Sequence, residues 1–100
     1  MVRIKGKAII YTAPGSDQLG QVSPYLLMER LADELVNTWP QLKVNKVFAS
    51  KKQQYHQIHC VLPSKYADEQ VRLIKAQIEL IAASLLADLQ EKINWAKMVG

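Results

Sequence analysis

The chain has 100 residues, 49% of them hydrophobic and 22% charged, and its formal net charge is +4. This length holds one hydrophobic core, so we predict a single domain over residues 1–100, and the composition excludes a disordered chain. The most apolar stretch, residues 78–89, is too short and too charged to cross a membrane. A single cysteine and the lack of a hydrophobic leader predict a cytoplasmic protein.

The first 40 residues predict a strand, a loop and a helix. Residues 3–12 alternate basic with small or apolar residues and then become fully apolar, as a strand entering a core does. Residues 13–22 contain Gly, Pro and Ser and predict a loop. Ser23 and Pro24 suit the N-cap and the first position of a helix, and apolar residues then recur at three- and four-residue spacing until Pro40 ends the helix.

The remainder predicts a hairpin and a long helix. Residues 42–50 and 55–63 read as two strands joined by the polar tip KKQQ, and no Gly or Pro interrupts the good helix formers from Asp68 to about Ala96. The order β-α-β-β-α predicts an α+β fold. We expect a two-layer sandwich, in which two helices cover one face of a three-stranded sheet and the C-terminal helix is long.

The two histidines and the only cysteine lie within residues 56–60. On a strand, His56 and His59 point to opposite faces, and no further His or Cys completes a zinc site. Cys60 also lies opposite His59, and about 13 Å of extended chain separates it from His56, which excludes a hydrogen-bonded catalytic pair. We therefore expect Cys60 in the core, and the sequence predicts no catalytic residue, metal site or cofactor. An enzyme stays open only as a site assembled across an interface.

The charges are segregated between the predicted elements. All nine acids lie in the first loop or the helices, whereas many of the thirteen basic residues lie in the strands and their connections. The basic residues of the strands and connections are Arg3, Lys5, Lys7, Lys43, Lys46, Lys51, Lys52 and Lys65. The strand part is therefore basic, and the helical part is net negative.

Strand parity assigns these basic residues to one face. On the first strand, Arg3, Lys5 and Lys7 share a face and leave the core to Val2, Ile4, Ala8 and Ile10. On the hairpin the expected core row is Val44, Phe48, Ile58, Cys60 and Leu62, which puts Lys43, Tyr55, Gln57 and His59 on the basic face. Lys46 breaks this pattern, so a bulge or an edge position is expected there.

A basic sheet face with aromatic side chains is typical of platforms that bind single-stranded nucleic acid, where cations meet phosphates and rings stack on bases. We predict a non-catalytic module that binds RNA or single-stranded DNA. The predicted binding residues are Arg3, Lys5, Lys7, Lys43, Lys51, Lys52, Tyr55 and His59. Lysines on exposed strands also prevent edge-to-edge pairing, so a role in solubility alone is the competing explanation.

The long helix predicts self-association. It would extend about 45 Å, against about 30 Å for a nine-residue strand, and more than half of its circumference between residues 78 and 89 is apolar. We predict a homodimer paired across a two-fold axis. Its predicted interface residues are Ile78, Ile81, Ala82, Leu85, Leu86, Leu89, Ile93 and Trp95. A different protein partner, or a helix that folds back near Asn94, would cover the same surface, so the alternative function is that of an assembly subunit.

Overall fold

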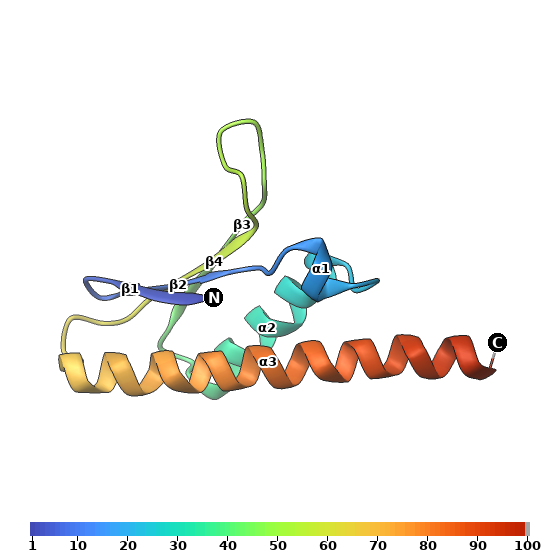
Figure 1. Ribbon diagram of the computed structural model, residues 1–100. Helices are drawn as coiled ribbons and strands as arrows, with labels where there is room; N and C mark the ends of the chain where they lie inside the picture. Colours follow the sequence, from blue (N-terminus) through green and yellow to red (C-terminus); the bar gives the residue numbers. More distant parts are fainter. Residues whose placement is uncertain (100) are drawn as a thin grey trace.

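A computed structural model describes residues 1–99 of the chain (Figure 1). The elements are β1 (Val2–Lys5), β2 (Ala8–Thr12), α1 (Ser16–Leu19), α2 (Pro24–Thr38), β3 (Lys43–Val47), β4 (Gln57–Val61) and α3 (Asp68–Val99). The predicted α+β class and the long C-terminal helix are confirmed. The described residues form a sheet of four strands rather than the predicted three, and three helices rather than two, because α1 lies within the predicted loop of residues 13–22.

The additional strand arises because residues 3–12 form a hairpin instead of one strand. β1 and β2 pair antiparallel with Lys5 opposite Ala8, so that Gly6 and Lys7 form a two-residue turn. Gly6 has a φ of 61°, whereas no residue other than glycine among those described has a positive φ. A glycine at the first central position is the pattern of a type II′ turn, which suits the twist of a hairpin.

This turn changes which residues of β2 face the core. Ile9 and Tyr11 lie opposite Ile4 and Val2 of β1 and share their face of the sheet. The prediction that Ala8 and Ile10 face the core is therefore wrong. These two residues lie on the other face, because the turn reverses the chain and shifts the parity of every residue after it.

All strands are antiparallel, in the order β1-β2-β4-β3, so β1 and β3 are the edges. The pairing of β3 with β4 is continuous from Lys43 to Val47, which excludes the predicted bulge at Lys46 and confirms the edge position. Lys46 faces the helices, where its Nζ lies 2.6 Å from Oε1 of Glu29 in α2. The ion pair explains why a lysine occupies an otherwise apolar row.

Both long helices cover the same face of the sheet, α3 against β1 and α2 against β3 and β4 (Figure 1). The core lies between these layers, and its fully buried side chains are Ile9, Leu27, Met28, Leu31, Leu35, Ile58, Cys60, Val71 and Ile78. Leu62 is also buried, as predicted. Phe48 is not a core residue, because it follows the end of β3 and is 44% exposed.

α3 determines the shape of the molecule. Its 32 residues correspond to about 48 Å at 1.5 Å per residue, and the longest dimension of the chain is 50 Å. The helix continues through Asn94, which excludes the alternative of a fold-back there, and Figure 1 shows its C-terminal turns extending past the sheet. Within residues 1–99, none of the helices combines the length and the apolar character that a membrane crossing requires.

Candidate nucleic-acid interface

The face of the sheet opposite the helices carries three cross-strand rows of side chains, of which two span all four strands and the third consists of Thr12, Gln57 and Val47. One row contains Lys5, Ala8, Val61 and Lys43, and the next contains Arg3, Ile10, His59 and Asn45. We call these eight residues the open face. Its cations stand on the two edge strands, about 14 Å apart at about 4.8 Å per strand. The central strands contribute small and apolar side chains and one imidazole, so the floor of the open face is largely apolar.

Hydrogen bonds fix the imidazole at the centre of this face. His59 Nε2 donates to Gln57 Oε1 at 3.0 Å, and Gln57 Nε2 donates to Thr12 Oγ1 at 3.2 Å. Gln57 itself is buried, and Ile10 is only 4% exposed although it lies on the sheet face opposite α2 and α3. The half-exposed His59 ring is therefore oriented by its neighbours, and Nδ1 is the free acceptor of the neutral ring.

The cations of the open face have no acidic partner among the described residues. The ion pairs there join Lys7 to Asp68, Lys46 to Glu29 and Lys75 to Glu79, which leaves Arg3, Lys5 and Lys43 unneutralised. All nine acids lie in α1, α2 and α3. The open face therefore presents positive charge to solvent, and the helical layer carries the negative charge.

Lys7, one of the predicted binding residues, lies away from the open face. It sits in the turn between β1 and β2, where its Nζ donates to the Tyr66 carbonyl oxygen and lies 3.3 Å from Asp68 Oδ1. The turn that divides the first strand thus directs Lys7 toward the start of α3. The hydrogen bond and the ion pair made by Lys7 connect the first hairpin to the start of α3.

Three other predicted binding residues lie on the nine-residue connection between β3 and β4, which is longer than the predicted tip. Lys51 and Lys52 are exposed, and Tyr55 is 57% exposed. Ser50 orders the tip, because its Oγ accepts hydrogen bonds from the N–H groups of Lys52 and Gln53. Figure 1 shows this loop projecting from the sheet on the side away from α3.

An aromatic cluster at the base of this loop was not predicted. The rings of Tyr25 and Phe48 are stacked with centroids 5.4 Å apart, and the His56 ring meets Tyr25 edge-on at 4.7 Å. His56 Nδ1 also accepts a hydrogen bond of 3.0 Å from the N–H of Ala49. In the sequence, the shared strand parity of Phe48 and His56 was the one feature that could have indicated this cluster. Tyr25 comes from the first turn of α2, so only the packing of that helix against the hairpin completes the cluster.

Cys60 is part of the core and is chemically protected. Its side chain is 1% exposed, and burial raises the pKa of the thiol to about 11. The thiol is therefore protonated at neutral pH, and no nucleophile is presented there. Within the described residues, no three His, Cys, Asp or Glu side chains converge as a set of metal ligands.

α3 places the predicted interface residues in three environments. Ile78, Ala82 and Leu89 are buried within the core of the chain itself. Four more are half-buried against that core, namely Ile81, Leu85, Leu86 and Ile93. Only Trp95 is largely exposed, at 66%. The sequence pattern did not separate these groups, because both flanks of the apolar stripe contain the same residue types.

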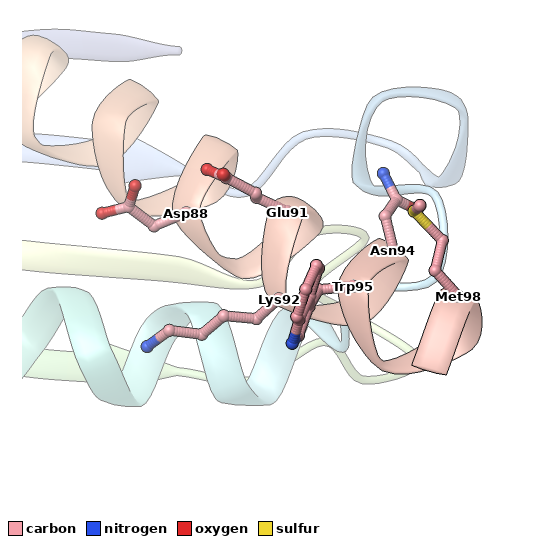
Figure 2. A pocket seen from close by; sticks show the side chains of 6 residues that line it. All are labelled: Asp88, Glu91, Lys92, Asn94, Trp95 and Met98. Carbon is pink, nitrogen blue, oxygen red and sulfur yellow. The ribbon is translucent and has the colours of Figure 1, made fainter. Parts of the chain in front are cut away.

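Other apolar residues of α3 are the most exposed. Leu73 is 65%, Leu80 72% and Met98 81% exposed. Near the C-terminus, Trp95 and Met98 lie on one side of the helix together with Asp88, Glu91, Lys92 and Asn94. Figure 2 shows Trp95 beside Lys92, and all six residues come from α3 alone. This end of the helix is therefore a second candidate surface, with mixed charge.

No protein-family model, curated protein or solved structure matches this chain. The charge and geometry of two exposed surfaces, the open face and the outer side of α3, are therefore the features that point to a function.

Proposed function

We propose that this protein is a non-catalytic module that binds single-stranded RNA or DNA through the open face of its sheet. One observation carries the proposal. Three cations without acidic partners border an apolar floor, and every acid of the chain lies in the helices. A polyanion is the partner that this distribution of charge complements.

The apolar floor favours a single strand over a duplex. Unpaired bases expose apolar faces that can lie on Val61 and the His59 ring, while phosphates approach the cations at the sheet edges. In a duplex the bases are stacked and paired, so only the phosphates would contact the sheet. Lys51 and Lys52 on the projecting loop extend the positive surface beyond the strands.

The test is fluorescence anisotropy with a labelled single-stranded RNA, a single-stranded DNA and a duplex DNA of equal length, each at two salt concentrations. We expect micromolar binding to both single strands, weaker binding to the duplex, and a steep loss of affinity at the higher salt concentration. The absence of binding to all three probes at low salt would remove the proposal and leave the lysines with a role in solubility.

A second candidate function is that of an assembly subunit acting through α3. The observation that favours it is the high exposure of Leu73, Leu80, Trp95 and Met98, which a partner would cover. A homodimer is the simplest such assembly, and a cytoplasmic setting suits the single reduced cysteine. This function requires α3 for complex formation and leaves the open-face cations dispensable, so the two functions are separable by mutation.

A further inference from the structure

A cleft of about 340 Å³ lies at the loop end of the sheet, between the segment that leads into α2 and the connection from β3 to β4. Leu19, Val22 and Pro24 line it from the first segment, and Gln54, Tyr55 and His56 line it from the second. The cleft lies at the loop end of the sheet and on the side of the helices, because Ala13 and His56 continue the strand parity of the core residues Tyr11 and Ile58. The N–H of Ala13 donates to the carbonyl oxygen of His56 at 2.9 Å, which joins the two walls.

The loop wall of the cleft is aromatic and ordered. The His56 ring is held by Tyr25 and Phe48, with centroids 4.7 Å and 6.1 Å away, and by the N–H of Ala49. Tyr55, beside it, is 57% exposed. An apolar wall opposite two rings suits a flat aromatic ligand, and a fixed ring loses little conformational freedom when a ligand stacks on it.

The charge around the loop wall selects a negatively charged ligand. Lys51 and Lys52 lie on the same connection, and residues 35–67 contain no acid. Asp17 is the nearest acid in the sequence to the opposite wall, and like Lys51 and Lys52 it does not line the cleft. A nucleotide combines these two features, because its flat aromatic base is linked to a negatively charged phosphate.

We propose that this cleft binds one unpaired base of a single strand that passes from the open face around the loop end of the sheet. The base stacks on Tyr55 and His56, the Gln54 amide meets its polar edge, and Lys51 and Lys52 contact the neighbouring phosphates. This inference rests on the proposed function and adds to it a subsite that distinguishes a strand with bases from a bare chain of phosphates.

The test compares an intact single-stranded DNA with a strand of the same length and charge that is abasic throughout. Ala49→Trp fills the cleft without altering the backbone donor to His56, and Tyr55→Leu removes an exposed ring. Trp95→Leu is the matched control, since it removes a similarly exposed ring on α3. Circular dichroism establishes that each variant is folded.

We expect the wild type to bind the intact strand at least about tenfold more tightly than the abasic strand. Ala49→Trp and Tyr55→Leu should each weaken binding of the intact strand about five- to tenfold and leave binding of the abasic strand unchanged, and Trp95→Leu should alter neither. Wild-type affinity for the intact strand in both cleft variants would overturn the inference while the proposed function stands. Absence of wild-type binding to either strand would overturn both.

Discussion

Replacing Arg3, Lys5 and Lys43 with glutamine should reduce the salt dependence of single-strand binding by more than half. The described residues provide five unneutralised cations near the open face, namely these three together with Lys51 and Lys52. At about 0.7 per phosphate contact, five contacts give a slope of log affinity against log salt of about −3.5, and the two loop lysines alone give about −1.4. A rise from about 50 mM to about 200 mM salt then weakens the wild type about a hundredfold and the variant about sevenfold.

The assay is an anisotropy titration of a labelled single strand of about 12 nucleotides at several salt concentrations. Arg30, Arg72 and Lys92, all exposed on the helices, provide the matched control, because changing them to glutamine produces the same fall in net charge, from +4 to +1. This control should keep the slope of the wild type. An equal loss of slope in both variants would show that net charge alone drives binding, and a wild-type slope in the open-face variant would refute the assignment of phosphate contacts.

Three further predictions concern the turn, the buried cysteine and α3. Gly6→Ala should lower the free energy of unfolding by about 1 kcal/mol, because alanine disfavours a positive φ. The control Gly15→Ala, at a φ of −70°, should change it by less than about 0.5 kcal/mol. Equal effects of the two substitutions in chemical denaturation would contradict the turn assignment. Cys60 should react with a thiol reagent only in denaturant. The free energy of unfolding should also fall as pH rises from 9 to about 11, since the thiol of the unfolded chain loses its proton at a lower pH than the buried thiol. Rapid labelling of the folded protein would contradict the burial of Cys60. Leu80→Lys should convert the dimer to a monomer in analytical ultracentrifugation and leave the affinity for single-stranded nucleic acid unchanged. A wild-type protein that is monomeric at all concentrations would contradict self-association.

The two long helices and the β3–β4 hairpin could be predicted because their signals are local, whereas α1 lies within residues 13–22, which were predicted to be a loop. Pro24 and Pro40 bracket α2, and no helix breaker lies between Asp68 and the end of the described residues. The first hairpin could not be predicted, because basic and apolar residues alternate without interruption across Gly6 and Lys7. One glycine was the only sign of the turn. Because the turn was not predicted, Ala8 and Ile10 were assigned to the wrong face of the sheet.

The candidate site was predictable to the extent that strand parity determines it. Parity alone places Lys43 and His59 on the same face, and the four-stranded pairing adds Arg3 and Lys5 to it. The aromatic cluster required the position of α2 relative to the hairpin, which no periodicity encodes. The same limit applies to α3, where only the packed structure distinguishes residues that cover the chain's own sheet from residues left to solvent.

The most direct test of the central claim is an amide NMR titration of the full chain with a single-stranded oligonucleotide. We predict that the largest chemical-shift changes occur along β1 and the β3–β4 hairpin, at residues such as Arg3, Asn45, His59 and Val61, while the amides of α3 remain close to their free positions. Changes confined to α3, or none at saturating oligonucleotide, would contradict the assignment of the open face as the nucleic-acid interface.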